Sequence, residues 1–137
     1  MAKLLRLVLL NLLLAAQSVM PNYVRIVWTY DENAWINVDP FTSTGINVRV
    51  GYLYIESPVK FSVYVTYSVT DISGMNPVPV RLTSVTLGNK SISMNPSYPT
   101  PVNNKFLSGM LYLGLLFIEP IKIDDFRLTL TFNFSAL

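Results

Sequence analysis

Few residues of this chain can carry chemistry, because it contains no His and no Cys. His is the usual general base and the commonest metal ligand, and the Cys thiolate is the strongest ordinary nucleophile. The remaining acidic pairs are Asp31-Glu32 and Asp124-Asp125. Adjacent carboxylates point to opposite faces of a strand, and neither pair has the ligand spacing of a known Ca²⁺ loop. We therefore expect no catalytic residue, no metal site, no cofactor and no enzymatic activity.

Motifs for nucleotide binding or hydrolysis are also missing, including the G-x-G-x-x-G, Walker and G-x-S-x-G patterns. The ten Lys and Arg residues are spread from Lys3 to Arg127 without a run. A nucleic-acid-binding surface needs clustered basic residues. The sequence therefore predicts no nucleic-acid partner.

Aromatic residues and asparagines leave two surface functions open. Eight Tyr and two Trp could form a sugar-stacking face, with Tyr64 and Trp35 at outward positions, although packing explains most strand aromatics. A secreted carbohydrate-binding module therefore remains an alternative. Asn89 begins an N-x-[ST] triplet in a turn, and Asn133 begins another on the polar face of a strand. Both are candidate glycosylation sites if the chain is exported.

The segment from residue 1 to 20 is an almost unbroken apolar run with three interpretations. As a secretory leader, it has basic Lys3 and Arg6, an apolar stretch and small residues near Ser18. As a retained helix it would span about 24 Å, short of the ~30 Å hydrocarbon core, so it would lie at a membrane interface or against protein. As an extended segment it could add a strand to a neighbour's sheet.

Beyond Pro21 the apolar residues alternate with polar ones, which indicates strands. Between residues 45 and 56, we expect Val48, Val50, Tyr52 and Tyr54 to share one face. A change of phase near Thr83-Ser84 predicts a bulge. The other expected strands and loops are Tyr23 to Tyr30, Ala34 to Asp39, Val59 to Thr70, Phe106 to Ile118 covered on both faces, Phe126 to Leu137, and a long projecting loop from Gly88 to Asn104.

About seven strands in 137 residues predict an all-β fold, a single antiparallel β-sandwich of immunoglobulin-like or small jelly-roll type. The expected division is an N-terminal arm or leader, 1–20, and a sandwich domain, 21–137. Charged residues make up 13% of the chain, against about 25% in soluble domains. Since dispersed charge keeps small domains apart, we expect much of this surface to be covered.

The chain resembles the β-rich subunits of extracellular filaments from thermophilic archaea and their viruses. The features that carry this resemblance are the arm Leu4 to Val19, the strands Val59 to Thr70 and Phe126 to Leu137, and the doubly apolar Phe106 to Ile118. It implies that an N-terminal strand of one subunit completes the sandwich of the next.

We therefore expect a structural subunit of an extracellular, cell-surface or virion filament, with other copies of itself as partners. The apolar terminal segment would pack into or onto a neighbouring subunit, and the arm would be able to contact membrane lipid. The alternative is a virion coat or envelope-associated protein with a lipid-contacting N-terminal helix. The expected assembly interface consists of Leu4, Leu5, Leu7, Val8, Leu9, Leu10, Leu12, Leu13, Leu113, Leu115 and Phe117.

Overall fold

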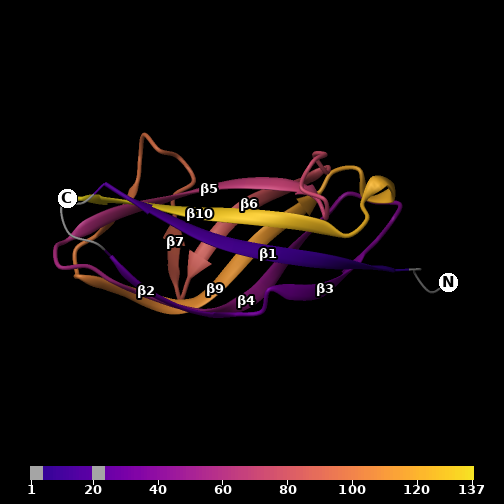
Figure 1. The fold of residues 1–137 in the computed structure, drawn as a ribbon. Helices are drawn as coiled ribbons and strands as arrows, with labels where there is room; N and C mark the ends of the chain where they lie inside the picture. Colours follow the sequence, from indigo (N-terminus) through magenta and orange to yellow (C-terminus); the bar gives the residue numbers. More distant parts are fainter. Residues whose placement is uncertain (1–4, 20–23) are drawn as a thin grey trace.

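The computed structural model, which describes residues 5–19 and 24–137, is a sandwich of two five-stranded β-sheets (Figure 1). Strands dominate because most segments alternate apolar and polar residues, which suits a sheet with one buried face. Their bounds are β1 Arg6–Ser18, β2 Arg25–Tyr30, β3 Asn33–Val38, β4 Thr44–Glu56, β5 Phe61–Asp71, β6 Val80–Leu87, β7 Lys90–Ile92, β8 Thr100–Val102, β9 Phe106–Phe117 and β10 Phe126–Ala136, with a 3-10 turn η1 at Pro120–Lys122.

The first sheet has the strand order β3-β1-β10-β5-β8, and the second has the order β2-β4-β9-β6-β7. Within the first sheet, β1 pairs in parallel with β10, from Leu10 opposite Phe126 to Ser18 opposite Phe134. The other strand pairings in the described residues are antiparallel. Figure 1 shows β1 and β10 running side by side, so that β1 begins and β10 ends at opposite ends of the sandwich.

The core lies between the two sheets and is built from one face of each strand. Along β10 every second residue is buried, including Phe126, Leu130 and Phe134. Their neighbours Thr129 and Thr131 point to the outer face and remain half-exposed. Aromatic rings join the layers at edge-to-face angles, as in Trp28 against Phe132, whose centroids lie 5.8 Å apart. The expected all-β sandwich is confirmed.

The N-terminal segment is part of this sandwich. Residues 6–18 form β1, which lies between β3 and β10 and buries Val8, Leu10 and Leu12 in the chain's own core. The helical interpretation is therefore wrong for Arg6–Ser18. Every second residue of this segment points into the core, and the segment fills the place of a strand between β3 and β10. A helix, whose side chains repeat about every 3.6 residues, does not match that two-residue spacing.

In β4, the expected face assignment is wrong beyond Val50. The pairing with β9 shifts between Arg49 and Gly51, so the bulge reverses the alternation. Leu53 and Ile55 are consequently fully buried, whereas Tyr52 is exposed. Gly51 has a φ of 150°, and a Cβ there would collide with the backbone oxygen of Thr29. Only glycine fits this position.

Two further expectations have different outcomes. The bulge near Thr83-Ser84 is confirmed, because the β6–β9 register shifts between Leu82 and Ser84. The expected loop from Gly88 to Asn104 instead contains the short strands β7 and β8. Strand β9 is also not covered on both faces: Leu113 and Leu115 are buried, but Tyr112 and Leu116 on the outer face are half-exposed. The described residues place no other layer on that face.

Candidate assembly interface

Polar contacts fix β1 in its own sheet. The Arg6 guanidinium donates hydrogen bonds to the backbone oxygens of Pro120, at 2.8 Å, and Ile121, at 3.4 Å. The Leu9 amide donates to the Asp125 carboxylate at 2.8 Å. Further along, the Asn11 side chain donates to Asn33 Oδ1 at 3.0 Å and accepts from Arg127 Nε at 3.1 Å. These contacts set the register of β1 between β3 and β10.

The outer face of β1 also carries leucines on both sides of Asn11, and the described part of the chain does not cover them. Leu7 and Leu13 are 56% and 39% exposed, and Leu9 between them is half-exposed. Trp35 of β3, 62% exposed, stands directly opposite Leu9. Together Leu7, Leu9, Leu13 and Trp35 make up the β1/β3 face. Water-exposed apolar side chains gathered in this way are typical of interaction surfaces.

The structure separates the expected interface residues into two groups. Leu5, Leu7, Leu9 and Leu13 lie at the surface. The inward residues lie within the core of the same chain, at 1% exposure or less. These inward residues are Val8, Leu10, Leu12, Leu113, Leu115 and Phe117. Leu4 lies outside the described residues. A neighbour can therefore reach only the first group while β1 stays in its own sheet.

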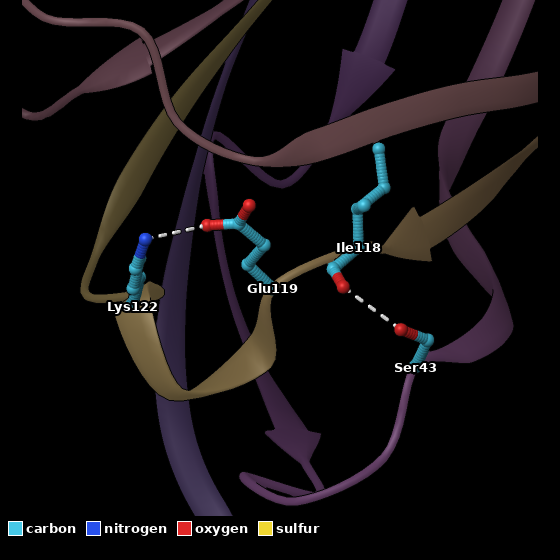
Figure 2. Close-up of polar contacts among 4 residues, drawn as sticks. All are labelled: Ser43, Ile118, Glu119 and Lys122. Carbon is cyan, nitrogen blue, oxygen red and sulfur yellow. Dashed lines mark hydrogen bonds and ion pairs between the residues drawn. The ribbon is translucent and has the colours of Figure 1, made fainter.

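A second apolar surface lies at the end of the sandwich where β1 begins. The loops 39–43, 72–79 and 118–125 meet there, and we name them the acidic end. Backbone and side-chain hydrogen bonds join them: the Ile118 amide donates to the oxygen of Pro79, and Ser43 Oγ donates to the Ile118 oxygen at 2.8 Å. Figure 2 shows this contact beside the Glu119–Lys122 ion pair, whose N···O distance is 2.9 Å.

The acidic end contains an open pocket of about 410 Å³ and several exposed apolar side chains. Phe41 is 81% exposed and Ile121 is 62% exposed, and both line the pocket. Leu5, Ile72, Met75 and Ile118 are exposed at the same end. The sequence analysis missed this surface. The signal was present in Pro40-Phe41 and Pro120-Ile121, where a proline places an apolar residue in a loop.

At the opposite end of the sandwich the charges differ. Arg25 pairs with Glu56 in the β2–β4 ladder, and Phe106 lies opposite Glu56 on β9. The Ser57 amide donates to the Lys105 oxygen, and the Leu137 amide donates to the Lys60 oxygen. We name this the basic end: its cations are Arg25, Lys60 and Lys105, and its exposed apolar side chains are Val19, Phe106 and Leu137.

The structure keeps the two acidic pairs apart. Asp31 and Glu32 lie in the turn between β2 and β3, halfway along the sandwich, whereas Asp124 and Asp125 precede β10 at the acidic end. Asp125 accepts the Leu9 amide, which gives it a structural role. Among the described residues, no three acidic side chains are grouped as metal ligands.

Tyrosines form a third exposed surface on the outer face of the second sheet. The β4 bulge places Tyr52 and Tyr54 outward, beside Met110 and Ser108 of β9. Tyr112 follows on the same face, opposite Arg49. Of the two aromatic residues expected on the surface, Trp35 is exposed and Tyr64 is only half-exposed. Trp35 belongs to the other sheet, so it cannot extend the tyrosine row.

The two N-x-[ST] asparagines lie in different surroundings. Asn89 is exposed in the turn between β6 and β7. Asn133 lies within β10, where its amide nitrogen donates to the backbone oxygens of Tyr64 and Thr131. An exported chain would therefore offer Asn89 to a glycosylating enzyme more readily than Asn133.

No family model matches the chain, and no curated protein matches its sequence. Among the residues that the structure describes, no helix is both long and apolar enough to cross a membrane. The fold and the surface therefore define the class of this protein. It is a two-sheet, all-β sandwich with an apolar β1/β3 face and two ends of unlike charge.

Proposed function

We propose that this protein is a structural subunit that assembles with copies of itself into an extracellular, cell-surface or virion filament. The observation that carries the proposal is that β1 has leucines on both faces, while only its inner face is buried within the chain. A second copy packing on the β1/β3 face would remove Leu7, Leu13 and Trp35 from water. Each buried apolar side chain of this size contributes about 1.5–3 kcal/mol.

Low charge supports the same proposal. With 13% charged residues, the chain has little electrostatic repulsion to keep copies apart. We propose an immunoglobulin-like or small jelly-roll sandwich as the type of fold that carries the interface. In such sandwiches the side chains of the two inner sheet faces interdigitate to form the core.

The experiment compares the full chain with a Leu13→Thr, Trp35→Thr double variant. Threonine keeps the preference for a strand but removes the apolar contact. We expect the wild type to form polymers in sedimentation velocity and negative-stain electron microscopy, and the double variant to form fewer polymers, because it lacks the β1/β3 contact. The control is Val27→Thr, which changes an exposed residue on the outer face of the other sheet. Polymers of the double variant as abundant as those of the wild type would contradict the proposed interface.

A carbohydrate-binding module is the second candidate, favoured by Tyr52, Tyr54 and Tyr112 on one outer sheet face. Sugar rings stack on exposed aromatic rings. The test is binding of the monomer to a panel of polysaccharides, with Tyr52→Ser, Tyr54→Ser as the matched variant. Binding that the variant loses would favour this candidate over the filament subunit.

A further inference from the structure

The two ends of the sandwich differ in charge, and both are apolar. Five of the eight acidic residues lie at the acidic end, namely Asp39, Asp71, Glu119, Asp124 and Asp125. The basic end has a single acidic side chain, Glu56, beside Arg25, Lys60 and Lys105. An end-to-end contact would therefore bring opposite charges together around an apolar centre, as in specific protein interfaces.

Cations among the described residues reduce this difference but do not remove it: Arg6, Lys122 and Arg127 stand against five carboxylates, which leaves the acidic end with an excess of two negative charges. Arg6 is held by the backbone oxygens of Pro120 and Ile121, Arg127 donates to Asn11, and Lys122 is paired with Glu119. Arg81 stands on the outer face of the second sheet, opposite Leu116. Asp124 lies in the 118–125 loop, three residues after the exposed Ile121.

We propose that the acidic end of one copy docks on the basic end of the next, so that Phe41, Ile118 and Ile121 cover Phe106 and Leu137 of a second copy. This inference rests on the proposed filament function and supplies the direction of growth. A contact between two different surfaces closes into a ring only if its rotation brings the ends together. Here the two surfaces lie at opposite ends of the sandwich, so each added copy extends the assembly in one direction and the result is an open polymer.

Strand exchange does not accompany this arrangement. Copies stacked end to end along β1 are displaced by at least the length of that 13-residue strand, about 40 Å. Ser18 and Arg25 are seven residues apart, and a fully extended connection of that length spans at most about 25 Å. A donated β1 could not reach the matching site of a copy stacked in this way. Strand β1 therefore stays in its own sheet and presents its outer face to neighbours.

The absence of native cysteines allows a direct test of the end contact by thiol cross-linking. Three full-length variants are assembled and treated with a short bis-maleimide: Phe41→Cys, Phe106→Cys, and the two substitutions in one chain. We expect a ladder of cross-linked oligomers from the double variant. Each single variant should yield no dimer, whereas mixing the two single variants should yield dimers and nothing larger.

Other outcomes overturn the inference in distinguishable ways. Cross-linked dimers of Phe41→Cys alone would mean that like ends meet. Fibres of the double variant without a ladder would mean that the ends do not touch, which leaves the filament proposal standing. If the wild type forms no polymer at all, the proposed function fails together with this inference.

Whether β1 is exchanged is tested with Asn11→Cys, Asn33→Cys, because these side chains are opposite one another on β1 and β3. Assembled fibres of this variant are oxidised and run on a non-reducing denaturing gel. A disulfide within one chain, seen as a monomer band, is the expected result. Disulfide-linked dimers and higher ladders would show that β1 sits in a neighbour's sheet, and the inference would be wrong.

Discussion

Asp71 organises the loop between β5 and β6. Its carboxylate accepts hydrogen bonds from the Ser73 hydroxyl, from the Asn76 side chain at 2.7 Å and from the Met75 amide at 3.2 Å. The hydrogen bond from Ser73, followed by that from Asn76, holds the pKa of the Asp71 carboxyl well below its ordinary value. A loop of the acidic end therefore depends on an ionised side chain.

This dependence predicts a specific effect of pH. A carboxyl whose pKa is lowered by folding contributes stability above its unfolded pKa of about 3.9, and the contribution is lost as the pH falls towards the folded pKa. Asp71→Asn should lower the free energy of unfolding at pH 7, and the difference from the wild type should shrink below about pH 4. Urea unfolding at several pH values measures it. Asp31→Asn, in an exposed turn, is the control, and an Asp71→Asn effect independent of pH would contradict the assignment.

Gly51 supports the bulge that turns Tyr52 and Tyr54 outward. Gly51→Ala should lower the free energy of unfolding by about 1–3 kcal/mol, because its φ is strained for other residues and the new Cβ meets the backbone of β2. Gly45→Ala on the same strand is the matched control, since the nearest atom to its Cβ would be the Leu115 oxygen at 3.8 Å. Equal stability losses in the two variants, measured by urea unfolding, would sink this account of the bulge.

Strand β1 has a different role on each face: its inner side chains stabilise the core, and its outer side chains are available to a neighbour. Leu10 is fully buried, so Leu10→Ala should cost about 2–5 kcal/mol of unfolding free energy. Leu13 points outward, so Leu13→Ala should change the stability of the monomer by less than about 0.5 kcal/mol. Chemical unfolding at low protein concentration, followed by tryptophan fluorescence, separates the two. A large loss in Leu13→Ala would place that side chain inside the core.

Sequence patterns predicted the strands because period-two alternation records which residues face the core. The same patterns failed at β4, since a single bulge at Arg49–Gly51 reverses the face of every residue that follows. They also left β1 undecided, because a leucine-rich run lacks the regular polar alternation that distinguishes a helix from a strand. The polar contacts that settle its position, Asn11 with Arg127 and Leu9 with Asp125, join residues 116 apart in the chain.

The candidate interface could be predicted from sequence only in part. The apolar segment itself pointed to Leu7, Leu9 and Leu13, which do reach the surface. Phe41, Ile118 and Ile121 could not be assigned to one surface, since their loops are brought together only when β3 pairs with β1 and β4 pairs with β9. Surfaces built from loops depend on tertiary structure rather than on local periodicity.

For the whole molecule, opposite charges at the two ends predict that assembly depends on salt. Lys60→Glu, Lys105→Glu reverses two cations of the basic end without touching the core, so the concentration needed for fibres should rise. Raising the salt concentration should weaken wild-type growth, because exposed charges are screened beyond ~8 Å at physiological ionic strength. Sedimentation across a salt series measures both effects. Growth that neither the substitutions nor salt alters would exclude an electrostatic part in the end contact.

The central claim is that copies of this chain form an open polymer. Negative-stain electron microscopy of the purified full chain, with sedimentation velocity on the same sample over a range of concentrations, tests it most directly. The account predicts fibres of uniform width that lengthen as the concentration rises. A single 15.4 kDa species at every concentration, without fibres, would contradict it.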